Sequence, residues 1–192
     1  MISSELIHEA GETLRTVRDC LRFGETRLRA GEVFLGHGTD DPWDEALALL
    51  MKVLHLPVNA DPRILDSRLL PSEVRDYLAL LVKRVNQKVP VPYLTGEAWF
   101  CGLPFMVDER VLIPRSPLAE LIEASFVPWL DPEQVHSVLD LCTGSGCIAI
   151  ACAYAFEHAR VDGSDISEEA LAVFEENIAR HGMEGQGQPI CS

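Results

Sequence analysis

The sequence predicts an α/β protein in which a helical N-terminal part precedes an incomplete doubly wound domain. Two observations predict this organisation. Leucine and valine residues recur at helical spacing through residues 1–88, whereas short apolar strands alternate with helices beyond residue 116. Alternating strands and helices form parallel sheets with right-handed crossovers. With 192 residues, 47% of them hydrophobic, the chain has enough apolar material for one domain or two small ones.

The first part of the chain carries clear helix signals. Gly36–Glu45 is predicted to be a turn followed by a helix start, with Asp41 as the N-cap and Pro42 at the first helical position. Pro57 is expected to end that helix, and a further helix is expected to begin near Ser72. Several arginines precede this region, and we favour a solvated helix face for them over a polyanion-binding surface. They are Arg15, Arg18, Arg22, Arg27 and Arg29.

The segment Val89–Tyr93 contains two prolines and is expected to interrupt the helices. Each proline removes a backbone donor and favours extended geometry in the residue before it, so the segment is predicted to be a domain boundary. Ala98–Phe100 and Leu103–Val107 then predict a short hairpin. Ser116-Pro117 is expected to cap a helix that runs to about Trp129.

A strand–helix–strand–helix pattern follows. Its predicted elements are a strand at Ser137–Leu141, a helix at Cys147–Phe156, a strand at Arg160–Ser164, a helix between Ser167 and Gly182, and the start of a third strand at Pro189–Ser192. A doubly wound domain needs about five or six strands, so the domain is predicted to be incomplete. Because the first strand would lack one neighbour, residues 116–192 are expected to be poorly stable alone and prone to aggregation.

The turn between the first strand and its helix, Asp140 to Cys147, predicts a nucleoside-type cofactor site. A glycine turn lets backbone N–H groups approach a ligand at the positive end of a helix, and an acid about 20 residues further on, here Asp165, binds ribose hydroxyls. The pattern from Gly144 to Ala149 also fits a dinucleotide. Asp140 would repel a pyrophosphate but attract an ammonium and a sulfonium, which favours S-adenosylmethionine. A packing turn without a ligand is the remaining alternative.

Net charge and cysteine spacing limit the partners and the cellular compartment that the chain fits. The net charge of −14 disfavours direct nucleic-acid binding and suits a basic partner protein, although it is equally consistent with solubility alone. The six cysteines form no Cys-x-x-Cys pair, so we expect no metal site and reduced thiols in a cytoplasmic protein. The N-terminus has no signal-peptide pattern, and the longest apolar run, Cys147–Phe156, is too short to span a membrane. We expect a monomer.

The chain resembles the protein-(glutamine-N(5)) methyltransferases along almost its whole length. The segments Asp140–Ile150 and Val111–Arg115 carry this resemblance. The residues Ser116–Glu120, Gly36–Ala46 and Ala98–Gly102 are similar to the branch that methylates large-subunit ribosomal protein L-three, not to the release-factor branch. The resemblance implies a Rossmann-like (class I) methyltransferase domain and S-adenosyl-L-methionine as cofactor. It also implies a helical substrate-recognition domain at residues 1–90, a linker and β-hairpin at 91–115, and a truncated cofactor-binding domain at 116–192.

The resemblance also assigns site residues. Those matching the cofactor site are Asp140, Cys142, Thr143, Gly144, Ser145, Gly146, Asp165 and Ile166. Pro114 and Arg115 match the substrate side, although Arg115 could equally pair with a nearby carboxylate. The three cysteines of this region, Cys142, Cys147 and Cys152, are interpreted as small buried apolar residues rather than redox or metal groups.

The family's catalytic motif, Asn-Pro-Pro-Tyr, does not occur in the 192 residues, which contain no Asn-Pro pair at all. In the family this motif is thought to hold the amide nitrogen of glutamine in line with the transferable methyl, so that catalysis is mainly by positioning. We therefore expect no catalytic residue in this chain and no activity from the 192-residue form alone. A non-catalytic module that binds a ribosomal protein and a fragment of an NAD-type oxidoreductase are the alternative hypotheses.

Overall fold

A computed structural model describes residues 1–36 and 38–192, and it divides into two compact units, Met1–Thr95 and Gly96–Ser192. His37, within the predicted turn Gly36–Glu45, lies outside the described residues. The division follows a five-residue helix, α5 (Val91–Thr95), in the segment whose prolines were expected to interrupt the helices. The carbonyl of Pro90 accepts hydrogen bonds from the backbone N–H groups of Tyr93 and Leu94, which starts this helical turn.

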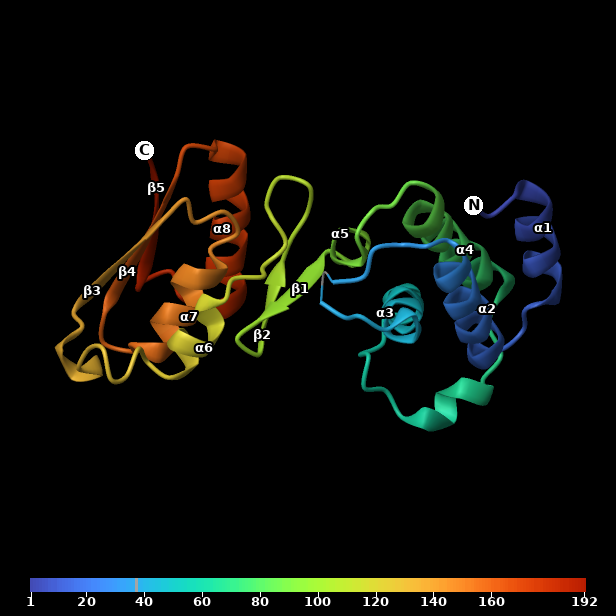
Figure 1. Cartoon of the computed structure of the whole chain (residues 1–192), viewed down its shortest axis with the longest axis horizontal. Helices are drawn as coiled ribbons and strands as arrows, with labels where there is room; N and C mark the ends of the chain where they lie inside the picture. The colour runs from blue at the N-terminus through green and yellow to red at the C-terminus, as the bar shows by residue number, and fades with distance from the viewer. Residues whose placement is uncertain (37) are drawn as a thin grey trace. The chain divides into compact units, whose positions relative to one another are not determined.

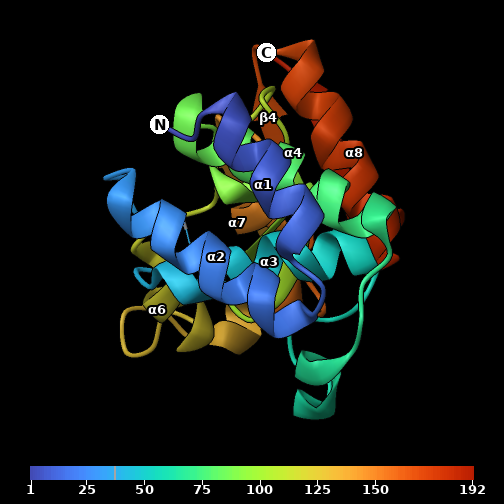
Figure 2. The same ribbon diagram turned by 90° about the vertical axis from the view of Figure 1, so that its right-hand side faces the viewer.

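The first unit is a bundle of helices around one apolar core (Figures 1 and 2). Its elements are α1 (Ser4–Thr13), α2 (Val17–Ala30), α3 (Pro42–Leu54), the 3-10 helix η1 (Pro62–Asp66) and α4 (Pro71–Asn86). Leu21, Leu49, Leu81 and Tyr77 are completely buried, and the Tyr77 hydroxyl donates to the Cys20 carbonyl at 3.2 Å. Burial of these large side chains is the main source of stability for the bundle.

The start of α3 is as predicted. The Asp41 side chain accepts a hydrogen bond from the Trp43 backbone N–H at 3.0 Å, and Pro42 is the first helical residue. The end of α3 differs, because His55 adopts a left-handed conformation (φ 54°) and terminates the helix at Leu54, before Pro57 is reached. Two of the arginines on α2 form ion pairs, Arg18 with exposed Asp66, and Arg29 with half-buried Glu25 and with Asp41.

A buried ion pair lies between α3 and α4. The guanidinium of Arg84 donates to both carboxylate oxygens of Glu45, at 2.8 and 2.7 Å, and the two side chains are 2% and 3% exposed. Arg84 also donates to the Phe34 carbonyl at 2.6 Å. This pair therefore fixes the segment that leads into α3 as well as the packing of α3 against α4.

The second unit begins with the predicted hairpin. Strands β1 (Glu97–Phe100) and β2 (Leu103–Met106) pair antiparallel, and both turn residues, Cys101 (φ 48°) and Gly102 (φ 69°), have positive φ. This is the combination that a two-residue hairpin turn requires.

A three-stranded parallel sheet in the order β3-β4-β5 follows, with strands β3 (Ser137–Leu141), β4 (Arg160–Asp165) and β5 (Gly187–Cys191). The crossover helices are α7 (Cys147–Ala155) and α8 (Glu168–His181), and both pack on the sheet (Figure 1). Ser167 caps the start of α8 and left-handed Gly182 ends it, as predicted. The expected third strand is present as β5, so the predicted α/β fold class is confirmed.

The helix expected from Ser116 to about Trp129 is much shorter. It is α6 (Leu118–Glu123), and a 3-10 turn, η2 (Pro132–Gln134), precedes β3. Ser125 and Phe126 have φ values of 47° and 57°, which a helix does not permit, and the ring of Phe126 stacks on Phe156 with centroids 6.1 Å apart. This aromatic contact and the loss of a donor at Pro128 outweigh the apolar pattern of the segment.

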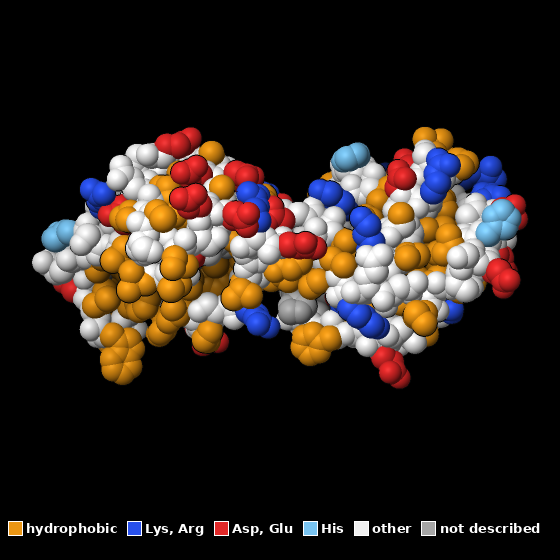
Figure 3. Space-filling view, turned by 90° about the horizontal axis from the view of Figure 1, so that it is seen from above, with side chains coloured by type: hydrophobic (Ala, Val, Ile, Leu, Met, Phe, Trp, Pro, Cys, Tyr) orange, Lys and Arg blue, Asp and Glu red, His pale blue; other side chains and the backbone are white. Residues whose placement is uncertain are grey.

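One face of the sheet is left open at β3. Leu139 and Leu141 are 57% and 68% exposed, and within the described residues β3 pairs only with β4. Figure 3 shows apolar side chains gathered on the surface of this unit. Parallel sheets are normally covered on both faces, so this face is unusual. In the part of the chain that the structure describes, no helix is long and apolar enough to cross a membrane.

Candidate functional site

The glycine turn joins the end of β3 to the start of α7 through three residues of positive φ. They are Cys142 (φ 60°), Gly144 (φ 56°) and Gly146 (φ 77°). A Cβ at Gly146 would lie 1.9 Å from the ring of Phe174 on α8, so only glycine fits there. The glycines therefore let the backbone of the turn lie close to α8 on one side and to a ligand on the other.

Backbone hydrogen bonds fix the shape of this turn. The Thr143 N–H donates to the Ser164 carbonyl at 2.9 Å, which ties the turn to the end of β4. The Gly146 N–H donates to the Thr143 carbonyl at 2.9 Å, which closes the turn on itself. These bonds leave little freedom to the residues that were predicted to bind a cofactor.

Asp140, at the end of β3, points its carboxylate into the turn. Its Oδ2 accepts a hydrogen bond of 2.7 Å from the Thr143 hydroxyl. Burial raises the pKa of Asp140 above its ordinary value; the bond from Thr143 opposes this shift, and the nearby charge of Asp165 adds to it. The surroundings of Asp140 thus disfavour its negative charge. A cationic ligand would stabilise that charge.

Asp165, at the end of β4, lies beside the same turn. Its Oδ2 accepts from the Gly144 N–H at 3.0 Å and its Oδ1 accepts from the Ser167 N–H, also at 3.0 Å. Because β3 and β4 are parallel neighbours, the two carboxylates lie at the same edge of the sheet. Each oxygen of Asp165 keeps a lone pair for a ligand hydroxyl. The adjacent Ile166 side chain is 84% exposed.

The structure brings most of the predicted cofactor residues together. Thr143, Ser145 and Gly146 are buried in the turn, Gly144 is half-buried, and Cys142 is exposed at the turn's start. Within the described residues, no hydrogen bond or ion pair joins the two predicted substrate-side residues to this turn. Pro114 is half-buried and Arg115 is exposed, and Arg115 forms neither an ion pair nor a side-chain hydrogen bond with any described residue. The ligand-binding roles of all these residues stay predictions.

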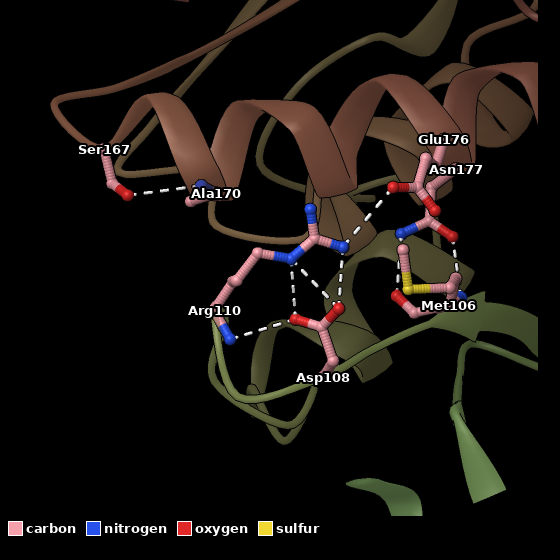
Figure 4. Close-up of polar contacts among 7 residues, drawn as sticks. All are labelled: Met106, Asp108, Arg110, Ser167, Ala170, Glu176 and Asn177. Carbon is pink, nitrogen blue, oxygen red and sulfur yellow. Dashed lines mark hydrogen bonds and ion pairs between the residues drawn. The ribbon is translucent and has the colours of Figure 1, made fainter.

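One residue of the site was missed from the sequence. Asn177 on α8 is completely buried, and its side-chain amide donates to the Ser145 carbonyl at 2.9 Å. It also donates to the Met106 carbonyl at 3.0 Å (Figure 4). Its Oδ1 accepts from the Met106 N–H at 2.7 Å. The sequence did hold a signal for this role. A polar residue three positions after Phe174, on the apolar face of an amphipathic helix, indicates a buried side chain that needs hydrogen-bond partners.

Cys147 and Cys152 on α7 are small buried side chains, as predicted, but the same prediction is wrong for Cys142, which lies exposed at the start of the glycine turn. Burial raises the pKa of both the Cys147 thiol and the Cys152 thiol to about 11, so neither is a thiolate near neutral pH. The described residues contain no group of three or more His, Cys, Asp or Glu placed to hold a metal ion.

One hollow of this unit lies away from the turn. It is an open cleft of about 510 Å³ at the beginning of β3, whose wall includes Phe126, Ser137 and Phe156. The turn lies at the opposite, carboxyl end of β3, where open parallel sheets bind their ligands.

Residues 123–189 match a family model described as methyltransferase small domain. Three curated proteins named ribosomal protein uL3 glutamine methyltransferase are similar to the chain. The protein from Bordetella pertussis is 49% identical over 174 residues, and those from Xylella fastidiosa and Xanthomonas campestris pv. campestris are each 50% identical over 171 residues. The alignments cover 89–90% of this chain but only 55–58% of the relatives, so the chain spans less than two thirds of their length.

Among solved structures, the N-terminal domain of human METTL16 in complex with SAH has a TM-score of 0.36 to this chain. The two are 14% identical, over 75% of this chain and 54% of that one. The similarity to the curated relatives confirms the resemblance that the sequence motifs indicated.

Proposed function

Because the chain shares about half of its aligned residues with uL3 glutamine methyltransferases, we propose that it is the part of such an enzyme that binds S-adenosyl-L-methionine. The observation that carries the proposal is the pair Asp140 and Asp165 on either side of one glycine turn. The proposed activity of the whole enzyme is transfer of a methyl group to the side-chain amide nitrogen of a glutamine in uL3.

Asp140 is the residue that favours this cofactor over a dinucleotide. Its carboxylate is partly desolvated and lies at the entrance to the turn, where a pyrophosphate would be repelled. The ammonium and sulfonium groups of S-adenosylmethionine are positive and would form charge-assisted interactions with it, each worth about 1.5–3 kcal/mol. The remaining lone pairs of Asp165 would accept the two ribose hydroxyls, and exposed Ile166 would contact the adenine.

The division of charge supports a basic protein as the substrate. Residues 96–192 carry 4 Lys and Arg against 16 Asp and Glu, a net charge of −12, whereas residues 1–95 carry 12 against 14, a net charge of −2. The acidic unit is the one that holds the proposed cofactor site. A basic substrate would therefore be attracted to the unit in which the methyl group is carried. Direct binding of nucleic acid is disfavoured for the same reason.

We propose that these 192 residues bind cofactor without transferring the methyl group. An amide nitrogen is a poor nucleophile because its lone pair is delocalised into the carbonyl, so the reaction depends on groups that orient it. The Asn-Pro-Pro-Tyr motif to which this role is assigned in the family is absent from the sequence.

Two measurements test the proposal. Isothermal titration should detect binding of S-adenosylhomocysteine to the 192-residue chain and no binding of NAD; the reverse preference would overturn the assignment of Asp140. Mass spectrometry of uL3 incubated with S-adenosylmethionine should show no methylated glutamine with this chain. A chain extended through Asn-Pro-Pro-Tyr should produce the methylated glutamine. Methyl transfer by the 192-residue form would falsify the proposal that these residues bind cofactor without catalysis.

A further inference from the structure

Asn177 is the residue of the second unit that hydrogen-bonds both to the glycine turn and to the β-hairpin. On the hairpin side its amide pairs with the N–H and carbonyl of Met106, in the way that a neighbouring strand would. On the turn side it donates to the Ser145 carbonyl. With no exposed surface, Asn177 has no water to replace these partners if they are lost.

The bond to Ser145 fixes the orientation of one peptide group. In the trans peptide between Ser145 and Gly146, the carbonyl and the N–H point in opposite directions. The carbonyl accepts from Asn177, and the N–H donates to the Thr143 carbonyl at 2.9 Å. Held at both ends, this peptide sets the left-handed conformation of Gly146, from which α7 begins.

The same helix supports the turn at a second point. Phe174 lies one turn before Asn177 on α8, and its ring fills the space below Gly146 and Gly163, where a Cβ would come within 1.9 and 2.6 Å of it. Phe174 therefore sets how closely the turn approaches α8, whereas Asn177 sets which way its peptide faces. Without Asn177, that peptide would be held only by the bond from the Gly146 N–H to the Thr143 carbonyl.

The hairpin is held on α8 by further contacts that do not reach the turn. His181 Nε2 bonds to the Pro104 carbonyl at 3.0 Å, and Arg180 pairs with Glu97. His181 Nδ1 bonds to the Tyr154 hydroxyl at 3.1 Å, at the end of α7 that lies away from the turn. Removing one of these would loosen the hairpin while leaving the Ser145–Gly146 peptide held. They provide matched controls for the role of Asn177.

We infer that Asn177 is a positioning residue for the cofactor, which orients the glycine turn through the Ser145 carbonyl and couples it to the hairpin. The inference rests on the proposed function, because the turn is taken as the cofactor site. Asn177 itself needs no contact with the cofactor. Its substitution should weaken cofactor binding through the backbone of the turn.

The test compares Asn177→Asp and Asn177→Ala with His181→Ala in the 192-residue chain. The aspartate keeps an acceptor for Met106 but loses both donors, whereas alanine removes every bond. For variants with a native circular dichroism spectrum, the dissociation constant of S-adenosylhomocysteine should rise about tenfold or more for either Asn177 variant. It should stay within about twofold of the wild type for His181→Ala.

A second readout needs no ligand. Amide hydrogen exchange at Gly146, measured by NMR, should be faster by about tenfold in the Asn177 variants and unchanged in His181→Ala. A wild-type chain that binds no cofactor would overturn the proposed function, and the exchange rates would still decide the role of Asn177. Unchanged exchange in a folded Asn177 variant would overturn the inference. So would loss of the fold in both variants, since Asn177 would then be a general structural residue.

Discussion

Arg84 and Glu45 form a two-pronged ion pair inside the helical unit, with both side chains at most 3% exposed. The pair joins α3 to α4 and, through the Phe34 carbonyl, holds the segment that precedes α3. Removal of one partner would leave the other charge buried without a counter-ion. The free energy of unfolding lost in this way is much larger than the net free energy that the intact pair contributes.

Arg84→Met should therefore lower the free energy of unfolding of the helical unit by about 3–5 kcal/mol. The double variant Arg84→Met with Glu45→Leu should recover most of that loss, because no charge remains buried. Urea titration followed by the fluorescence of Trp43, which lies in this unit, measures both. Arg18→Met, which breaks an exposed pair with Asp66, should change stability by about 0.5 kcal/mol or less. A double variant as unstable as the single one would contradict this account.

Gly146 and Gly144 should respond differently to alanine. Both have positive φ, so each substitution incurs strain of about 1–2 kcal/mol. At Gly144 the new methyl group would meet open space, whereas at Gly146 it would overlap the Phe174 ring. Gly146→Ala should destabilise the second unit by about 3 kcal/mol or more, and Gly144→Ala by less than about 2 kcal/mol. Thermal unfolding followed by circular dichroism compares them, and equal losses would show that Phe174 does not restrict the turn.

Asp140→Asn should stabilise the unliganded chain while weakening cofactor binding. The pKa of Asp140 is raised in the folded state, so the native protein binds this proton more readily than the unfolded chain does. Its ionised form therefore lowers stability above that pKa, and the cost disappears as the pH falls through it. At pH 7 the variant should gain up to about 1 kcal/mol, and the gain should vanish below about pH 4.

The same substitution should raise the dissociation constant of S-adenosylhomocysteine at least about tenfold, because a charge-assisted contact is lost. In the wild type, affinity should decline as acid protonates Asp140. Asp162→Asn, on β4 beside an exposed Arg160, should leave the affinity unchanged. Equal losses in the two variants would argue that only net charge matters.

The cysteines should separate by exposure in alkylation experiments. Cys142 and Cys191 are exposed, whereas burial raises the pKa of the Cys20 thiol to about 12 and those of Cys147 and Cys152 to about 11. Iodoacetamide followed by mass spectrometry should label the first two in the native chain and the other three only after unfolding. Saturating S-adenosylhomocysteine should slow labelling of Cys142, at the start of the turn, and NAD should not. Unaltered labelling with a bound cofactor would place the ligand elsewhere.

Local signals in the sequence predicted most of the elements. The cap at Asp41, the hairpin turn at Cys101-Gly102 and the helix end at Gly182 each depend on residues within a few positions, and all three are confirmed. The helix after Ser116 was predicted too long. Its apolar pattern continues, and Pro128 is a local signal against a helix, but the contact between Phe126 and Phe156 joins residues 30 positions apart and leaves no local signal.

The arrangement of the candidate site was largely predictable in the same way, whereas its ligand-binding role stays a prediction. The strand, the glycines and the two carboxylates follow one another along the chain, and hydrogen bonds join Asp140 to Thr143 and Asp165 to Gly144. Asn177 lies 32 positions from Ser145 and 71 from Met106, so its bonds exist only in the folded unit. The substrate-side prediction for Pro114 and Arg115 stays a prediction.

The division at Thr95 and Gly96 gives each part of the chain its own core, and this has a calorimetric consequence. Two cores need not melt together, so a single midpoint would not describe the protein. A cofactor held by residues 140–166 would shift only the transition of the second unit, in proportion to the logarithm of its concentration. Trp43 reports on one transition and Trp99 and Trp129 on the other, so ligand-dependent melting should reveal which half of the chain holds the site.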